Sequence, residues 1–156
     1  MTSIPDKKIP VELGYGPHLT LDGYNCEGRG LNDMKFVYAF LSKFPQMIGM
    51  RKIMPPYVFY HDGGDKPEDC GFSGIVIIAE SHISIHTYPV KKFLVLDIFS
   101  CKNFNTDKAV EIITKAFKIG KHDKQVLNRG REFPKNIQLA AEIIKEDRRE
   151  IKTAKF

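Results

Sequence analysis

The sequence predicts an α+β fold, a two-layer α/β sandwich in which helices pack on one face of a mainly antiparallel sheet. Short stretches of alternating apolar and polar residues recur along the chain, which indicates half-buried strands. Stretches with helical spacing are few, and the order of segments is β-α-β-β-β-α-β-α. The 156 residues are enough to bury a core, and neither a linker nor a repeat divides them. We therefore expect a single domain over 1–156, with a tail at 1–12.

The expected elements follow one another closely. After the polar tail we predict a strand over 18–22, a helix over 31–44, a strand over 53–60, a central strand over 72–79 followed by a polar motif at 80–89, a strand over 93–101, a helix over 106–118, a short strand over 125–128 and a final helix over 137–152. The motif and the strand 93–101 are separated by a short turn at Lys91–Lys92, so they resemble a hairpin.

The first helix has recognisable ends. Asn32 or Asp33 can cap its start, and Pro45 and Gly49 are expected to end it. Its apolar residues recur at helical spacing, which predicts that this stripe packs in the core. The stripe consists of Met34, Val37, Tyr38, Leu41 and Phe44.

The second helix and the strand before it show equally clear patterns. Thr106–Asp107 are expected to cap the helix, and Gly120 stops it. In the strand 93–101, alternation places Asp97 and Cys101 on the same side.

Composition narrows the classes of partner. The net charge is +5, but the densest basic cluster, over 145–155, is interleaved with acids, so no nucleic-acid partner is expected. No apolar run reaches the ~18 residues of a membrane span, and the N-terminus lacks a signal-type apolar region, so we expect a cytoplasmic protein and no membrane partner. Cys26, Cys70 and Cys101 fit neither a disulfide framework nor a zinc pattern, which favours reduced thiols.

Polar residues interrupt the most apolar part of the chain. The run from Ile75 to Ala79 stops at Glu80-Ser81-His82, and alternation then resumes through His86 to Pro89. Burying an acid, hydroxyls and two imidazoles costs free energy unless they are paired. Core packing gives no reason for them, so the stretch 75–89 is the candidate site.

Chemistry alone leaves several readings of this stretch. A hydrolase triad could use Ser81, with His82 or His86 as base and Glu80 or Asp97 as acid, but the Gly-x-Ser-x-Gly elbow is absent. Two histidines four residues apart on a strand lie about 13 Å from each other, too far to share a metal unless the backbone bends. The acidic loop 61–71 lacks the spacing of a calcium-binding loop, so no metal is expected.

One resemblance covers the motif and its flanks. The string Glu80–Pro89, preceded by Gly71–Gly74 and followed by Asp97–Cys101, resembles the prokaryotic S-adenosylmethionine decarboxylases, over about 18–134. These are self-processing, pyruvoyl-dependent enzymes that supply the aminopropyl donor for spermidine synthesis. The resemblance implies a two-layer α/β sandwich, a small-molecule substrate and a homodimer of processed protomers with active sites near the interface.

The resemblance also implies roles for single residues. The Ser81 hydroxyl would attack the Glu80 carbonyl, the resulting ester would eliminate, and hydrolysis would leave a pyruvoyl group at position 81. The zymogen would thus yield a β chain 1–80 and an α chain 81–156. His86 matches the histidine that assists elimination, and Ser73 matches a serine that supports processing. The pyruvoyl ketone would form a Schiff base with the substrate amine, and Cys101 would return a proton to its α-carbon.

Two further points concern the position of Ser81 relative to His86 and the residues that would hold the substrate. A continuous strand would place Ser81 opposite His86, so we predict a bend or bulge at 80–82. Val90 stands where the family carries a glutamate for the substrate ribose, and the upstream aromatic residue that stacks on adenine is not evident.

Two versions of the function remain open, beside an inactive partner subunit that the presence of Ser81, His86 and Cys101 disfavours. S-adenosylmethionine could be the substrate, held differently. The other version is an arginine or ornithine decarboxylase whose cationic substrate is held by acidic side chains. The residues proposed to hold these substrates are Tyr88, Phe59 or Phe72 for adenosine, and Glu68 and Asp69 for a cation.

Overall fold

The computed structural model describes residues 14–132, 141, 142, 145 and 149. It divides into two compact units, residues 16–127 and residues 1–15 with 128–156. The fold described below is that of the first unit. The tail at 1–12 and most of the helix expected over 137–152 lie outside the described residues, and the expectation of a single domain stays a prediction.

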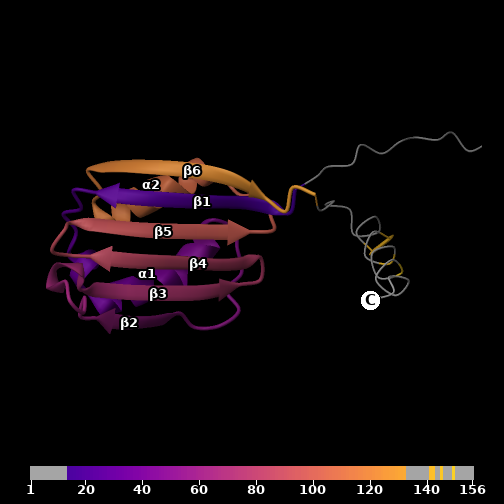
Figure 1. The fold of residues 1–156 in the computed structure, drawn as a ribbon. Helices are drawn as coiled ribbons and strands as arrows, with labels where there is room; N and C mark the ends of the chain where they lie inside the picture. The colour runs from indigo at the N-terminus through magenta and orange to yellow at the C-terminus, as the bar shows by residue number, and fades with distance from the viewer. Residues whose placement is uncertain (1–13, 133–140, 143–144, 146–148, 150–156) are drawn as a thin grey trace, which may run out of the picture. The chain divides into compact units, whose positions relative to one another are not determined.

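The described elements form a sheet and two α-helices, as the sequence predicted (Figure 1). Their bounds are β1 Gly16–Tyr24, η1 Arg29–Asn32, α1 Met34–Met47, β2 Tyr57–His61, η2 Pro67–Asp69, β3 Gly71–Ile78, β4 Ser81–Tyr88, β5 Phe93–Ser100, α2 Thr106–Phe117 and β6 Lys121–Arg129. The sheet order is β2-β3-β4-β5-β1-β6, and the pairs β2·β3, β3·β4, β4·β5 and β5·β1 are antiparallel. Both α-helices lie on the same side of this sheet (Figure 1), so the α+β prediction is confirmed.

The sequence predicted three strands between the two α-helices, and the structure has four, β2 to β5. The stretch 72–89 does not contain a single strand with a motif after it, because the chain reverses at Ala79–Glu80 and β3 pairs with β4 as a hairpin. β4 and β5, which were expected to form a hairpin, do so and occupy the centre of the sheet, whereas β3 is second from the edge. The strand predicted over 53–60 begins later, at Tyr57, and β6 begins earlier than expected, at Lys121.

The helix ends depart slightly from their predicted positions. The Asp33 side chain accepts hydrogen bonds from the backbone N–H groups of Lys35 and Phe36, so Asp33 is the cap of α1. Pro45 does not end α1. It sits in the last turn, and its carbonyl accepts from the N–H groups of Ile48 and Met50. The cap of α2 is Asn105 rather than Thr106–Asp107, since its side chain accepts from the N–H of Lys108.

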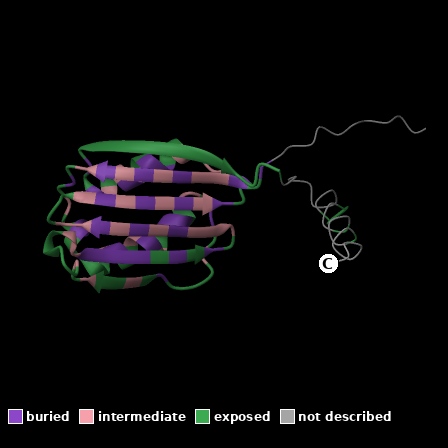
Figure 2. Cartoon of the chain, viewed as in Figure 1, coloured by how far each residue is buried: buried purple, intermediate pink, exposed green. Residues whose placement is uncertain are grey.

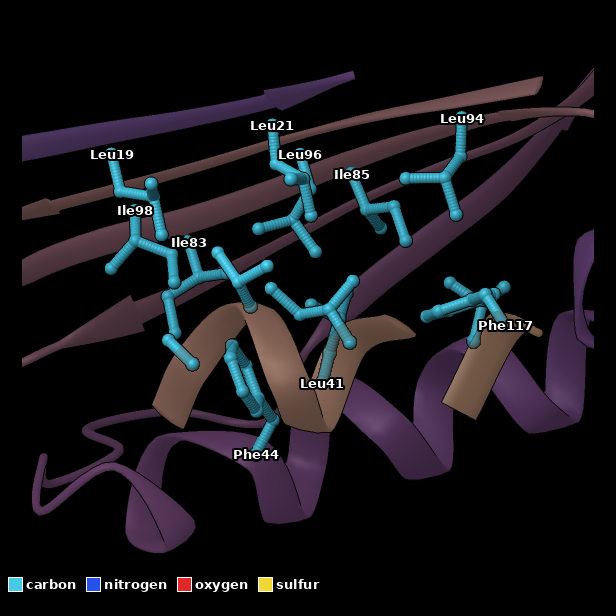
Figure 3. Packing of buried hydrophobic residues seen from close by; sticks show 14 of the residues in the cluster. Leu19, Leu21, Leu41, Phe44, Ile83, Ile85, Leu94, Leu96, Ile98 and Phe117 are labelled. Atoms are coloured by element: carbon cyan, nitrogen blue, oxygen red, sulfur yellow. The ribbon is translucent and has the colours of Figure 1, made fainter. Parts of the chain in front are cut away.

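The core lies between the sheet and the helices. Side chains from one face of β1, β4 and β5 point towards α1 and α2, where Leu41, Phe44 and Phe117 are fully buried (Figure 3). Two members of the predicted α1 stripe are not core residues, because Met34 and Tyr38 are 39% and 43% exposed. The stripe is therefore narrower than helical spacing suggested.

The other face of the sheet carries the polar residues of the motif. Burial alternates residue by residue along β1, β4 and β5 (Figure 2), so one set of side chains is buried and the other is half-exposed. No described helix covers this second face, which we call the open face. Exposed apolar side chains of β2 and β3 lie on it, namely Tyr57, Phe59, Ile75 and Ile77.

Candidate functional site

The Glu80–Ser81 peptide bond lies at the tip of the β3–β4 hairpin. Ile78 pairs with Ser81 across the two-residue turn Ala79–Glu80. Neither Ala79 nor Glu80 has a positive φ, and the unusual backbone angle falls on the next residue, Ser81. The chain thus reverses before Ser81, and not within 80–82 as predicted. β4 runs without a break from Ser81 to Tyr88, so Ser81 and His86 stay on opposite faces of the strand.

Ser81 has a strained backbone and a hydroxyl that is already paired. Its φ is 151°, in a region that residues other than glycine rarely adopt. The Ser81 Oγ lies 3.2 Å from Nδ1 of His82. Strain and a nearby basic nitrogen thus meet at the serine that follows the turn.

The Glu80 carbonyl is held by the residue that follows β5. The backbone N–H of Cys101 donates to this oxygen at 2.9 Å. The Glu80 carboxylate accepts from the backbone N–H of Arg51 at 3.2 Å, which fixes the side chain as well. Backbone N–H groups therefore hold both the carbonyl oxygen and the side-chain carboxylate of Glu80. Cys101 itself is exposed directly after β5, so its thiol is accessible beside the turn.

Ser73 and His86 form a second cluster on the open face. They are paired across β3 and β4, and the Ser73 Oγ lies 2.7 Å from Nδ1 of His86. Ser73 is 6% exposed and His86 is half-buried. The structure thus brings together two of the four catalytic residues suggested by the resemblance.

The two clusters do not meet within one chain. Ser81 and His86 are five residues apart on β4, about 16 Å at ~3.3 Å per residue. By alternation along β4, Ser81 is on the same face of the strand as the buried Ile83 and Ile85, whereas His86 lies on the open face. Within the chain, therefore, Ser81 lies near Cys101 at one place, and Ser73 lies with His86 at another.

Of the residues considered for a hydrolase triad, Ser81 and His82 are in contact, but Asp97 lies apart from them. Asp97 pairs with Ser84 in the sheet, accepts from its hydroxyl at 3.3 Å, and lies 3.5 Å from Nε2 of His18. It contacts neither Ser81 nor His86 in any interaction that the structure records. Among the described residues, no group of three or more His, Cys, Asp or Glu side chains could hold a metal.

A cavity of about 480 Å³ opens at the far end of β4 from Ser81. Tyr88 lines it, two residues beyond His86, and its ring stacks on Phe93 with centroids 5.6 Å apart. Lys91 forms an ion pair with Asp69 in the wall, and that lysine holds the pKa of Asp69 below its usual range. The remaining wall residues are His61, Asp62, Gly63 and Gly64. A volume of this size is typical of small-molecule sites.

The other suggested substrate residues lie elsewhere. Phe72 is 9% exposed and belongs to the core cluster, so it does not line the cavity. Glu68 is exposed in η2 and is not among the lining residues either. Phe59 is 46% exposed on the open face at β2. Four of the residues suggested to hold the substrate precede β4, namely Phe59, Glu68, Asp69 and Phe72. Of these, only Asp69 lines the cavity.

His61 is a cavity residue that sequence reasoning did not single out. Its ring contacts Tyr88, with centroids 6.0 Å apart, although β3 runs between the two strands. The position between them is Gly71, opposite His61 in the sheet, and a Cβ there would lie 1.8 Å from the Thr87 carbonyl oxygen. A glycine in an otherwise apolar strand was the available signal of close approach.

Cys26 and Cys70 lie apart from the turn. Cys26 is buried in the core cluster, and burial raises the pKa of its thiol to about 11. Cys70 is half-buried at the start of β3. No described helix is both long and apolar enough to span a membrane.

Comparison with known proteins gives a consistent result. The sequence model of a family described as S-adenosylmethionine decarboxylase matches residues 17–130. The S-adenosylmethionine decarboxylase proenzyme of Clostridium botulinum is 30% identical over 117 residues, which are 74% of this chain and 95% of that protein. The proenzyme of Pyrococcus horikoshii is 32% identical over 104 residues, 66% of this chain and 70% of its own length.

A solved structure shares the fold. The adenosylmethionine decarboxylase of Aquifex aeolicus superposes with a TM-score of 0.64 at 24% sequence identity, over 76% of this chain and 93% of that one. At this identity the likeness concerns the fold.

Proposed function

Because the chain belongs to the S-adenosylmethionine decarboxylase family, we propose that it is a self-processing proenzyme that matures into a pyruvoyl-dependent decarboxylase of S-adenosylmethionine. The observation that carries the proposal is the geometry of the Glu80–Ser81 bond. It lies at a hairpin tip, its carbonyl accepts a hydrogen bond from Cys101, and the serine after it is strained. The product would supply the aminopropyl donor for spermidine synthesis.

Processing uses residues already at the turn. The Ser81 Oγ attacks the Glu80 carbonyl carbon, and the amide becomes an ester as the C–N bond breaks. Removal of the Ser81 α-proton then expels the Glu80 carboxylate and leaves a dehydroalanine. Hydrolysis of that residue, with loss of ammonia, gives a pyruvoyl group at the start of chain 81–156. The backbone N–H of Cys101 is placed to stabilise the oxyanion of the first step.

The surroundings of residue 81 suit that cofactor. A pyruvoyl group supplies a ketone that takes up the electron pair left when CO₂ departs. Cys101 follows β5 beside the turn with an exposed thiol, so it is placed to return a proton to the substrate α-carbon. The strain at Ser81 is relieved when the bond before it is cut, which favours the mature chain pair.

A homodimer would complete the site. Ser73 and His86 lie about 16 Å from Ser81 of the same chain, too far to assist its elimination. The open face carries exposed Tyr57 and Phe59 on β2 and Ile75 on β3, the strand that pairs with β4, and this apolar surface is of the kind that protein partners cover. A second copy packed on this face by two-fold symmetry would bring its own His86 pair towards Ser81.

The cavity at Tyr88 then becomes the pocket for the rest of the substrate. It begins two residues beyond His86 on the open face, about 7 Å along the strand. The stacked rings of Tyr88 and Phe93 suit a planar base, and the Asp62 carboxylate at the rim can accept from ribose hydroxyls. These contacts would replace the glutamate that Val90 does not provide.

The alternative substrate, arginine or ornithine, is favoured by one observation: two carboxylates, Asp62 and Asp69, line the cavity. Lys91 pairs with Asp69 and would repel the cationic end of arginine or ornithine. The adenosine part of S-adenosylmethionine, which we place in this cavity, is uncharged, and for this reason we prefer S-adenosylmethionine. Release of CO₂ from each of the three compounds by purified protein decides between them.

The intact mass of the purified protein tests the proposal as a whole. Two chains, with the second beginning at a carbonyl in place of Ser81, are the expected result. A single 17.8 kDa chain would contradict it. Ser81→Ala is expected to remain one inactive chain, and Ser84→Ala, in which a hydroxyl is removed from the same strand, is expected to be cleaved.

A further inference from the structure

We propose that His82 is the general base of the first processing step, the acyl shift at Glu80–Ser81. The inference rests on the proposed self-processing function and goes beyond it by assigning the two steps of processing to different histidines. His82 would act on the Ser81 hydroxyl, and His86 only on the later elimination.

The contact that carries this is between neighbouring side chains. Nδ1 of His82 lies 3.2 Å from the Ser81 Oγ, within the reach that proton transfer needs. In the tautomer that carries its proton on Nε2, the imidazole accepts through Nδ1. His82 is thus a basic side chain in direct contact with this hydroxyl.

His86 cannot perform this step within the chain. It lies about 16 Å along β4, and its Nδ1 is engaged by the Ser73 hydroxyl at 2.7 Å. His82 is held where it is needed, because its ring packs edge-on against Phe99 with centroids 6.0 Å apart. Both residues of this contact lie on paired strands, His82 directly opposite Phe99.

The step balances without any added reactant. The Ser81 Oγ forms a bond to the Glu80 carbonyl carbon while its proton moves to Nδ1 of His82. The carbonyl π electrons move to oxygen, which the N–H of Cys101 stabilises at 2.9 Å. The oxyanion then collapses, the bond between that carbon and the Ser81 nitrogen breaks, and the proton on His82 passes to the nitrogen. The products are an ester and a free amine.

Two histidine variants separate the steps. His82→Asn keeps a polar atom near the position of Nδ1 but cannot take up a proton, so cleavage is expected to slow by about 100-fold or more. The chain that accumulates should be the amide, which neutral hydroxylamine does not cut. His86→Ala, by contrast, should accumulate the ester, which hydroxylamine cuts between residues 80 and 81. The His122→Asn variant, in which an exposed histidine on β6 is changed, serves as the matched control and should process normally.

Three outcomes would overturn the inference. One is cleavage of His82→Asn at the wild-type rate. Another is a His82→Asn chain that hydroxylamine cuts, since the acyl shift would then have occurred without the base. If His82→Asn does not reach the wild-type circular dichroism spectrum, His82→Ala with added imidazole decides. Restored cleavage supports a proton-transfer role, and a lack of rescue counts against it.

Failure of the inference is distinguishable from failure of the proposed function. A wild-type chain that never cleaves would contradict self-processing itself. A wild-type chain that cleaves, alongside a His82→Asn chain that cleaves equally well, would remove only the assignment of the base.

Discussion

The backbone N–H of Cys101 donates a hydrogen bond to the carbonyl oxygen of Glu80, 2.9 Å away. The two residues are 21 positions apart, and the contact forms because β4 and β5 pair with Ser81 opposite Ser100. Cys101 therefore contributes to the turn in two ways: its main chain holds the Glu80 carbonyl, and its thiol lies exposed beside the bond proposed to be cleaved. The sheet register would thus link the proposed self-processing to the decarboxylation proposed to follow it.

Replacing Cys101 by alanine should separate these two contributions. The backbone N–H remains in Cys101→Ala, so cleavage at Glu80–Ser81 is expected to proceed. Decarboxylation with the normal amine product should fall by about 100-fold or more, because the proton donor is lost. Intact mass measures the first effect, and amine formation measures the second. Full turnover to the normal product would exclude a donor role for this thiol, and Cys70→Ala should behave as wild type.

The distance between Ser81 and His86 predicts complementation between subunits. In cells that make Ser81→Ala and His86→Ala chains together, a mixed dimer of the proposed geometry would place an intact His86 next to an intact Ser81 of the other chain. About half of the His86→Ala chains should then be cleaved if subunits pair at random, with tags of different mass identifying each chain. Each variant made alone should show no pyruvoyl chain. If the co-expressed chains also stay whole, the site is complete within one protomer or the dimer has another geometry.

The cysteines should differ in reactivity. Burial raises the pKa of the Cys26 thiol to about 11, and the side chain is only 2% exposed, so it should resist a thiol reagent at pH 8 in the folded protein. Cys101 is exposed and should be labelled first. Peptide mapping after brief labelling with iodoacetamide checks the order, and labelling in urea should make Cys26 reactive. Early modification of Cys26 in the native protein would contradict its burial.

Alternation and capping residues predicted most of the fold, because those signals are local. The strands β1, β4 and β5 and both α-helices follow from periods of two and 3.6 residues. The reversal at Ala79–Glu80 was harder to place, since Ile75–Ala79 and Ile83–Ile85 are both apolar and no Asn-Gly or Gly-Gly pair marks the turn. Sequence reasoning could only infer that the strand must bend there.

The sequence predicted which residues of the candidate site carry reactive groups, but not which of them are in contact. The motif drew attention to Ser81 and His86, but sequence spacing does not show which of the two histidines contacts the serine. The contact of His61 with Tyr88 depends on pairing across three strands and on the missing side chain of Gly71. Such contacts arise from register, which single-sequence patterns specify only weakly.

The core predicts a large effect for a truncation in α1. Leu41 is fully buried, and its Cδ1 lies 2.7 Å from where a Cβ on Gly74 would stand, so helix and strand are in close contact there. Leu41→Ala is expected to lower the free energy of unfolding by about 2–5 kcal/mol through lost contacts and a residual cavity. Tyr38→Ala is the control one turn earlier, because Tyr38 is 43% exposed. Urea unfolding of both variants in the Ser81→Ala background, where chain cleavage does not complicate the transition, provides the measurement. Similar losses for the two would contradict the packing described for α1.

The ion pair of Lys91 with Asp69 predicts how the cavity wall responds to pH. Lys91 lowers the pKa of Asp69 below its ordinary 3.8, so the contribution of this carboxylate to stability is present above that pH and is lost as pH falls through the lowered value. Asp69 raises the pKa of Lys91 above its ordinary 10.5, so the contribution of the ammonium group is present below that pH and is lost as pH rises through the raised value. The pair should therefore stabilise the fold between about pH 4 and pH 10.5.

Asp69→Asn tests this window directly. At pH 7 the variant should unfold at a lower urea concentration than its parent, and the difference should shrink at pH 2 and in 1 M salt, because both side chains remain partly exposed to solvent. Asp65→Asn, an exposed change in the same loop, should alter neither midpoint. A deficit in Asp69→Asn that stays constant from pH 7 to pH 2 would mean that the amide disturbs the wall by its shape and not by the loss of charge.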